Sequence, residues 1–545
     1  MAGMTTVVDA LTGAQQTFGA AQLTQQQGSS RLVQLVDAPS WAQQTFGAAQ
    51  LGDQRRSKRL VHIASQVARD PGASLPSQLG GRWGELKAAY RLLHEPDVTH
   101  EALSQPHWQQ TREWAKKQQE PVLLVHDDTE LDYGYDPAVS GLGPIGNGSH
   151  AGFFVHSVLA VVPQASGERV LGLAYQKPWV RQRAPRTTKG KKQSRRQRAH
   201  RERESGHWPH AVEEVGPAPE GGRWVHVGDR YADMYDFLLA CLSSGCDVLV
   251  RAEQNRCLQV WQEEEEEASQ QLDHLIDRMK SWSVQGAREQ EVPSEHERRA
   301  RRARLCISWG QVHIQPPDGH AGLGKQAPVL RLWAIHVWEP DPPVCKEGQR
   351  PRVRREKHGA ARKRRQRRQQ QAEPGQEDER MEPLEWFLLT SVPVEREADA
   401  WQRVDWYACR WGVEDFHKGL KTGCHMQERH LRDEASLERL LGLLAPIAVR
   451  LLQLRELVQE IPEQPVLSWV PREEAQLIAW QRQVPVEHLT VRGFLREVAH
   501  MGGFLGRKSD GQPGWQTLWK GWMRLHWQAE GIRLANQHAP PKRCG

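Results

Sequence analysis

The sequence lacks a long apolar run, a C-x-x-C cysteine pair, and a basic N-terminal flank leading into an apolar core. Its longest apolar run near a predicted helix, residues 440–449, ends at Arg450 and is too short to span a bilayer. Without the basic flank and apolar core, no secretory signal is visible. The eight scattered cysteines argue against a zinc ribbon or a disulfide scaffold and indicate reduced thiols. These absences exclude the membrane and secreted classes and predict a cytoplasmic protein with no membrane partner.

The net charge is also small. The chain has 73 Lys+Arg against 67 Asp+Glu, and +6 over 545 residues does not by itself indicate a nucleic-acid binder. The charge is nevertheless concentrated, because residues 181–203 and residues 350–368 hold eleven Lys or Arg each. Such blocks are compatible with contacts to a DNA backbone and equally with solvated loops.

Tryptophan is abundant, with 22 residues. Hydrophobic residues make up 38% of the chain and glycine adds 46 residues, so a sizeable core is possible. Some of the tryptophans must fill that core, but indole rings also stack on nucleic-acid bases.

The chain divides by pattern into several segments. Residues 14–23 recur unchanged at 42–51, and two copies are too few for a solenoid. Apolar residues at helical spacing predict helices, and strands followed by a helix and another strand predict an α/β core. The predicted segments are an N-terminal extension (1–38), a helical module (39–118), the first part of the core (119–256), a β-rich insertion with charged low-complexity loops (257–396), the last part of the core with a long helix from about 400 to 422 (397–460), and a C-terminal helical domain (461–545).

Two of the predicted strands end in carboxylates. Asp127, followed by Asp128, closes the strand that begins at 121, and Asp229 closes the strand that begins at 224. Sites in α/β proteins are commonly built at strand ends, and carboxylates there can hold a hard divalent cation. The alternative is that each aspartate caps a turn or a helix.

The predicted helix at 400–422 carries a third set of polar residues: Tyr407, Arg410, Glu414 and Lys421. In a regular helix of 3.6 residues per turn, the spacing Y-x2-R-x3-E-x6-K places them within about 60° of one another. The alternative is a solvated face in which Arg410 and Glu414 form an i,i+4 ion pair. Together with the strand-end acids, the stripe indicates phosphate chemistry, in which acids bind metal and cations hold phosphate.

These motifs resemble the bacterial cut-and-paste DDE transposases of the Tn-five type, in the insertion-sequence-four family. The resemblance spans about residues 41–535 and rests on HDDTELDY, FFVHSVL, ESGHW, VGDRYAD, VLVRAE, EWFLLTS and YACRWGVEDFHKGLKTG. It implies an α/β fold with a ribonuclease-H-like mixed-sheet core, a β-rich insertion before the last catalytic helix, an N-terminal helical domain that binds transposon ends, and a C-terminal helical domain that dimerises.

The resemblance also assigns site residues. It implies that Asp127, Asp229 and Glu414 are the catalytic and metal-binding acids, with Asp128 as the alternative to Asp127. They would hold two Mg²⁺ ions, for which Mn²⁺ can substitute. The DNA-binding residues that it implies are Trp386, which stacks a flipped base, together with Tyr407, Arg410, Lys421, Arg251, Arg55, Arg56 and Arg59.

The chemistry implied is hydrolysis of one strand at the transposon end, attack by the freed 3′-hydroxyl to give a hairpin, and strand transfer into target DNA. The partners would be double-stranded DNA and a second copy of the chain, in a bacterial cytoplasm and on the nucleoid when bound to DNA. Two alternatives stay open: a catalytically decayed DNA-binding or dimerising regulator, and a structure-specific nuclease without strand transfer.

Overall fold

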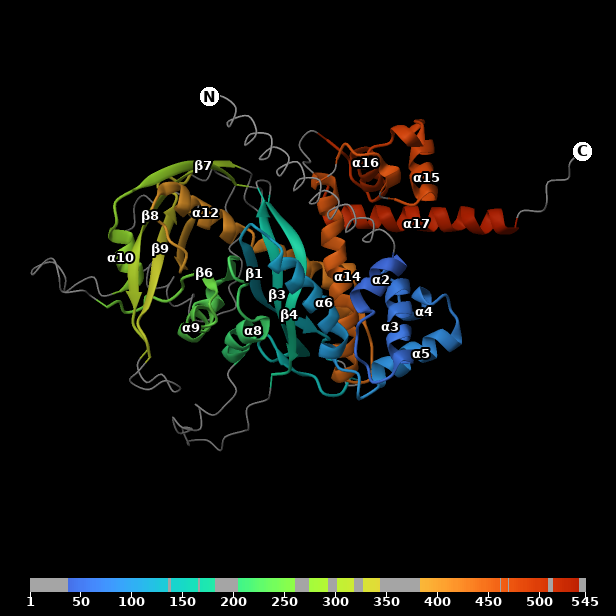
Figure 1. Ribbon diagram of the computed structural model, residues 1–545, viewed down its shortest axis with the longest axis horizontal. Helices are drawn as coiled ribbons and strands as arrows, with labels where there is room; N and C mark the ends of the chain where they lie inside the picture. The colour runs from blue at the N-terminus through green and yellow to red at the C-terminus, as the bar shows by residue number, and fades with distance from the viewer. Residues whose placement is uncertain are drawn as a thin grey trace, which may run out of the picture. The chain divides into compact units, whose positions relative to one another are not determined.

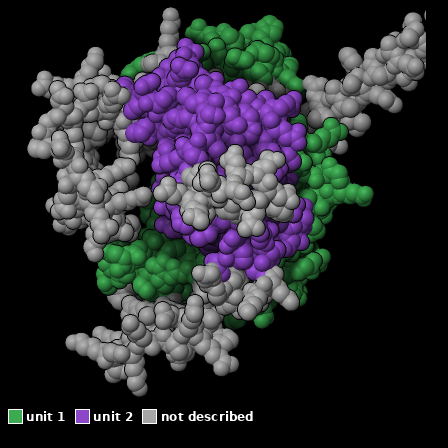
Figure 2. Space-filling view, turned by 90° about the vertical axis from the view of Figure 1, so that its left-hand side faces the viewer, with its two compact units in different colours: residues 1–224, 409–545 green, residues 225–408 purple. Residues whose placement is uncertain are grey.

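The computed structural model describes residues 38–135, 139–164, 167–181, 204–259, 274–292, 301–317, 327–343, 383–460, 462–468, 470–507 and 513–538. The chain forms two compact units: unit 1 is residues 1–224 and 409–545, and unit 2 is residues 225–408 (Figure 2). Most of the N-terminal extension and block 350–368 lie outside the described residues, as does block 181–203 after its first residue.

Unit 1 begins with a group of helices, shown in blue in Figure 1. They are α2 (Ala38–Phe46), α3 (Gln54–Val67), α4 (Leu75–Gln78), α5 (Trp83–His94) and α6 (His100–Lys116). Leu60, Ile63 and Val67 of α3 are all buried, which confirms the apolar helical spacing of this segment. Asp53 accepts a hydrogen bond from the Arg55 backbone N–H, a common way for a helix to begin.

The sheet of unit 1 is antiparallel. Strand β3 (His150–Gln164) pairs with β1 (Val122–Asp132), β2 (Gly143–Ile145) and β4 (Gly167–Trp179). Residues 152–162 of β3 are buried without interruption, as expected for a central strand covered on both faces. Helices α6, α8 (His207–Val215) and α14 (Glu434–Glu460) pack against β4.

Unit 2 holds a mixed sheet with the order β5-β6-β10-β9-β8-β7. Parallel β5 (Trp224–Gly228) and β6 (Asp247–Arg251) are joined through α9 (Tyr235–Ser243). The other strands are antiparallel: β7 (Gly286–Val292), β8 (Arg301–Ile314), β9 (Leu330–Trp338) and β10 (Glu385–Thr390). The remaining helices are α10 (Leu275–Ser281) and α12 (Glu397–Ala408). Apart from α10, the regular elements in the described part of the segment predicted to be β-rich are therefore strands.

The predicted single helix at 400–422 is wrong. Helix α12 ends at Ala408, α13 (Trp411–Lys418) begins after a turn, and residues Gly419–Gly423 (η5) form a π-helix. In the turn, the Gly412 and Val413 N–H groups bond to carbonyls only three residues back, which tightens the backbone locally. Tyr407, Arg410, Glu414 and Lys421 therefore do not share one regular helix, and the 60° stripe does not apply.

The C-terminal region of unit 1 is helical. It contains α14, α15 (Arg472–Arg482), α16 (Val491–Met501) and α17 (Trp515–His538). A Cβ on Gly521 would lie 1.6 Å from the Val498 carbonyl oxygen, and one on Gly502 would lie 1.8 Å from the Thr517 carbonyl oxygen. Glycine at these two positions is what allows α16 and α17 to approach so closely.

Within the described residues, none of the helices combines the length and apolarity that a membrane crossing requires. The apolar run at 440–449 lies in α14, where its leucines are buried inside unit 1.

Candidate active site

The two aspartates at the end of the apolar part of β1 have different surroundings. The Trp208 indole N–H donates to Asp128 Oδ2 over 2.8 Å, and His156 Nδ1 lies 2.9 Å from Asp128 Oδ1. Burial alone would raise the pKa of Asp128, but the charge and hydrogen bond of His156 and the hydrogen bond of Trp208 hold it below its ordinary value. Asp128 is therefore the centre of a hydrogen-bonded cluster.

The Asp128 cluster continues into the core. His156 Nε2 lies 3.1 Å from His126 Nδ1, and the His126 and Trp208 rings stack with centroids 5.8 Å apart. His126 and His156 are fully buried, and both ring nitrogens of His156 have hydrogen-bond partners. Trp208 is the aromatic residue of the ESGHW motif. That motif was the one sequence feature that could have pointed to this cluster.

Asp127 points to the other face of β1, as the two-residue period of a strand requires. Its Oδ2 lies 3.4 Å from His417 Nδ1, and the Asp127 side chain is 18% exposed. His417 belongs to α13, one turn after Glu414, and α13 packs against β1. The structure thus brings Asp127 against the helix that carries Glu414. His417 was not anticipated from the sequence.

Glu414 is paired with a cation. Arg410 Nη2 lies 2.6 Å from Glu414 Oε1, and the Arg410 guanidinium covers the Trp411 ring at 4.9 Å from its centroid. The predicted i,i+4 ion pair is confirmed, although Arg410 precedes α13. Val413, Phe416 and Leu420 are fully buried, so the apolar side of this segment packs inward.

Lys421 lies in the π-helix and is near several acids. Burial lowers the pKa of its ammonium group, while the charges of Glu130, Asp127 and Asp132 oppose that shift. The Lys421 ammonium group could bind a phosphate, while the carboxylates near it stay ionised.

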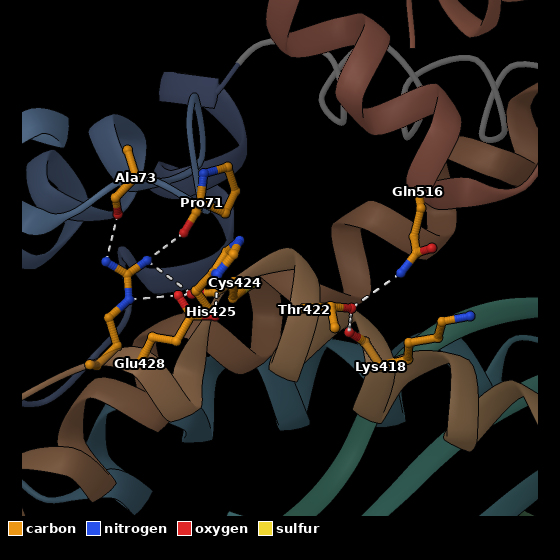
Figure 3. Close-up of polar contacts among 9 residues, drawn as sticks. Pro71, Ala73, Lys418, Thr422, Cys424, His425, Glu428 and Gln516 are labelled. Carbon is orange, nitrogen blue, oxygen red and sulfur yellow. Dashed lines mark hydrogen bonds and ion pairs between the residues drawn. The ribbon is translucent and has the colours of Figure 1, made fainter. Parts of the chain in front are cut away.

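The segment that follows the π-helix is fastened to the N-terminal helices (Figure 3). Arg429 donates to the carbonyls of Pro71 and Ala73 over 2.6 and 2.5 Å, and to the Cys424 carbonyl over 2.9 Å. The Gln516 amide of α17 donates to Thr422 Oγ1 over 3.2 Å. Contacts from the start of the chain and from its end thus meet beside η5. No sequence pattern identified Arg429.

In unit 2, the structure places three predicted residues on neighbouring elements. Arg251, at the end of β6, donates to the Glu385 carbonyl over 2.9 Å and forms a side-chain hydrogen bond with Tyr407 of α12. Burial and the nearby Arg230 lower the pKa of Arg251. Because Leu388 pairs with Arg251 across β10 and β6, Trp386 lies on the same sheet face, one diagonal position away. The Trp386 side chain is half-buried and is not a core tryptophan.

Asp229 also lies in unit 2, directly after β5. Its Oδ1 accepts from the Tyr231 backbone N–H over 2.8 Å, so it caps the short 3-10 turn η2 (Arg230–Ala232). Asp229 therefore has the capping role that was considered as the alternative for strand-end aspartates. The cap occupies one oxygen and is compatible with a further role for the carboxylate. Within the described ranges, no three His, Cys, Asp or Glu side chains are grouped so as to hold a metal ion.

The arginines predicted to contact transposon ends are mostly engaged within the helical module. Arg56 pairs with Glu95 at 2.7 Å, and Arg59 pairs with Glu85 at 2.6 Å, so both join α3 to α5 or its end. Arg55 is exposed. A second exposed set lies along α5 at intervals of four residues: Trp83, Lys87 and Arg91.

Three family models match the chain, and together they cover more than half of it. They are Transposase DNA-binding at residues 38–98, Transposase DDE domain at 220–449, and Transposase Tn5 dimerisation domain at 445–540. Asp229 and Glu414 lie within the DDE match, whose fold is ribonuclease-H-like, and the mixed α/β architecture agrees with it. The order of the matches is also the order predicted from the sequence. The chain therefore belongs to the DDE transposases of the Tn5 type.

Proposed function

We propose that this transposase performs cut-and-paste transposition: it cleaves DNA at the ends of its element and joins those ends to target DNA. The observation that carries the proposal is the approach of Asp127 Oδ2 to His417 Nδ1, at 3.4 Å, because it sets the first acid against the helix of Glu414. We assign Asp229 as the third acid of this reaction.

The three acids suit divalent cations. Carboxylate oxygens are the ligands that Mg²⁺ prefers, and neither Asp127 nor Glu414 is fully buried. Asp127, Asp229 and Glu414 would hold two Mg²⁺ ions, which supply activation of a nucleophilic oxygen and stabilisation of the leaving oxygen. Mn²⁺ can substitute for Mg²⁺ in this proposed role.

The proposed reaction begins with hydrolysis of one strand at the transposon end. The freed 3′-hydroxyl then attacks the opposite strand, which releases the flanking DNA and leaves a hairpin that is reopened before strand transfer. A hairpin bends the strand tightly, and extrusion of one base relieves the strain. Trp386 would stack that base. Arg251, Tyr407, Arg410 and Lys421 would hold the phosphates around it. The hydrogen bonds of Arg251 to the Glu385 carbonyl of β10 and to Tyr407 support this role for the first two.

End binding is proposed for the N-terminal helices, and dimerisation for the C-terminal ones. The exposed side of α5, with Trp83, Lys87 and Arg91, fits a DNA surface better than Arg56 and Arg59, whose charges are neutralised within the module. Arg55 remains a proposed DNA contact because it is exposed. The working form would be a homodimer on paired ends.

The test is an incubation of the purified chain with duplexes carrying its element's ends, with Mg²⁺ or Mn²⁺. Nicked, hairpin and joined products are expected from the wild type, and Glu414→Gln should bind the duplex without forming any of them. Binding without products from the wild type would instead identify a decayed regulator. Cleavage of an intact end, together with no joining of a precut end, would identify a nuclease.

Trp386 separates the hairpin step from the first nick. Trp386→Ala should reduce hairpin formation at least tenfold while leaving nicking within about twofold, and Trp386→Phe should restore much of the loss, because stacking on one base contributes about 1–3 kcal/mol. Equal losses at both steps would argue against base stacking by this residue.

A further inference from the structure

Arg429 carries a buried positive charge that is bonded to backbone carbonyls. It is 8% exposed, and its guanidinium donates to three backbone carbonyls, two of them 356 and 358 residues earlier in the chain. Figure 3 labels the three residues that supply these carbonyls: Pro71, Ala73 and Cys424. Burial lowers the pKa of Arg429, which reflects the cost of removing the cation from water. A buried charge is held only where several hydrogen bonds satisfy it.

One end of the Arg429 contact is the loop between α3 and α4 in the N-terminal helices. Pro71 and Ala73 supply the two carbonyls, and between them Gly72 approaches His425, since a Cβ on Gly72 would lie 3.3 Å from the imidazole ring. His425 has a left-handed backbone with φ of 51°, which is uncommon for a residue other than glycine. This loop and the His425 turn therefore fit together closely.

The other end of the contact is the closing turn of the π-helix. The Cys424 N–H bonds to the Gly419 carbonyl over 2.9 Å and ends η5, while the Cys424 carbonyl accepts from Arg429. Lys421 lies inside that turn, between the two residues that close it. A shift of Arg429 would therefore be passed through Cys424 to Lys421.

The same segment is attached to β1. Tyr133 Oη donates to the Met426 carbonyl over 3.1 Å, and the Gln427 amide donates to the Asp132 carbonyl over 3.4 Å. Residues 424–429 are thus bonded on one side to the α3–α4 loop and on the other to the strand that carries Asp127.

We propose that Arg429 is a positioning residue, which transmits the placement of the N-terminal DNA-binding helices to Lys421 and so makes cleavage depend on end binding. In this scheme Arg429 contacts neither the proposed catalytic acids nor the DNA. It acts through its hydrogen bond to the Cys424 carbonyl, in the turn that closes η5. The inference rests on the proposed function, because it assigns Arg429 a part in DNA cleavage.

The experiment compares wild type, Arg429→Ala, Arg429→Lys and Arg432→Ala in the full chain. Arg432 is an exposed arginine three residues later and is the matched control. Affinity for a labelled end duplex is measured by anisotropy, and nicking is measured in single turnover at saturating protein, at a temperature where unfolding curves show every variant folded. Arg429→Ala should bind within about twofold of wild type but nick at least tenfold more slowly. Lysine, which lacks the forked donor geometry, should restore activity only in part.

A double-mutant cycle with Lys421→Ala tests the route. If Arg429 acts through Lys421, the two losses should not multiply, whereas independent structural damage would make them multiply. The proposal is overturned if folded Arg429→Ala nicks like wild type, if its end affinity falls in step with nicking, or if the two losses multiply. Absence of nicking by both wild type and Arg432→Ala would instead refute the proposed function.

Discussion

Trp208 donates its indole N–H to Asp128 over 2.8 Å, while the neighbouring Asp127 faces His417 on the opposite side of β1. This arrangement separates two carboxylates that are adjacent in sequence. One is bonded into the core cluster of His156 and His126, and the other is directed toward α13.

The separation predicts different consequences for two matched substitutions. Asp127→Asn should abolish cleavage and change stability little. Asp128→Asn should retain measurable cleavage but lower the free energy of unfolding by about 1–3 kcal/mol, since it removes the charge that His156 and Trp208 bond. Denaturant unfolding and single-turnover cleavage of both variants provide the check. A stable, inactive Asp128→Asn protein would mean that Asp128 is the first acid after all.

The exposed side of α5 predicts two separable effects on end binding. Trp83→Ala should weaken binding roughly tenfold at every salt concentration, as loss of one aromatic contact to DNA does. Lys87→Ala should reduce the slope of log K against log salt by about 0.9, the value for one phosphate contact. Trp480→Ala is the control, because Trp480 is 79% exposed, similar to the 72% of Trp83, but lies outside the DNA-binding match. Unchanged affinity in Trp83→Ala would exclude this side of α5 from the interface.

The α16–α17 contact predicts opposite results for two glycines of one helix. Gly521→Ala should destabilise the C-terminal helices by about 1–3 kcal/mol, because overpacking forces the helices apart. Gly531→Ala adds a Cβ in open space and should be neutral or stabilising by up to about 1 kcal/mol, from helix propensity alone. Thermal unfolding of the two variants measures the difference. Equal effects would show that the close approach at Gly521 does not hold in solution.

Glu438 predicts a pH dependence of stability. Burial, followed by the hydrogen bond and charge of Glu434, raises its pKa to about 8, against the opposing charges of Lys177 and Arg439. Between the ordinary value of 4.5 and about 8, the folded chain binds more protons than the unfolded chain, so this group makes stability fall as pH rises through that range. Glu438→Gln should flatten the fall, measured as urea midpoints from pH 5 to pH 8.5. Parallel curves for the variant and wild type would show that Glu438 ionises normally.

Much of the secondary structure could be predicted, since it depends on neighbours in sequence. The apolar runs ending at Asp127 and Asp229 are strands, and the spacing of Leu60, Ile63 and Val67 is that of a helix. The single helix at 400–422 was predicted wrongly because its residues have helical spacing on both sides of the Cys409–Arg410 turn. Spacing carries no information on the tight turn there, in which two N–H groups bond to carbonyls three residues back.

The candidate site was predictable in residue type but not in arrangement. The family resemblance was enough to propose Asp127, Asp229 and Glu414 as acids of one reaction, and that proposal needed no coordinates. Only the tertiary structure assigned Asp127 and Asp128 to opposite environments, paired Arg56 and Arg59 with acids of another helix segment, and joined Arg429 to Pro71 and Ala73. The physical reason is range: periodicity and capping are local, whereas the partner of a buried charge or carboxylate is chosen by which distant segments the fold brings within about 3 Å of it.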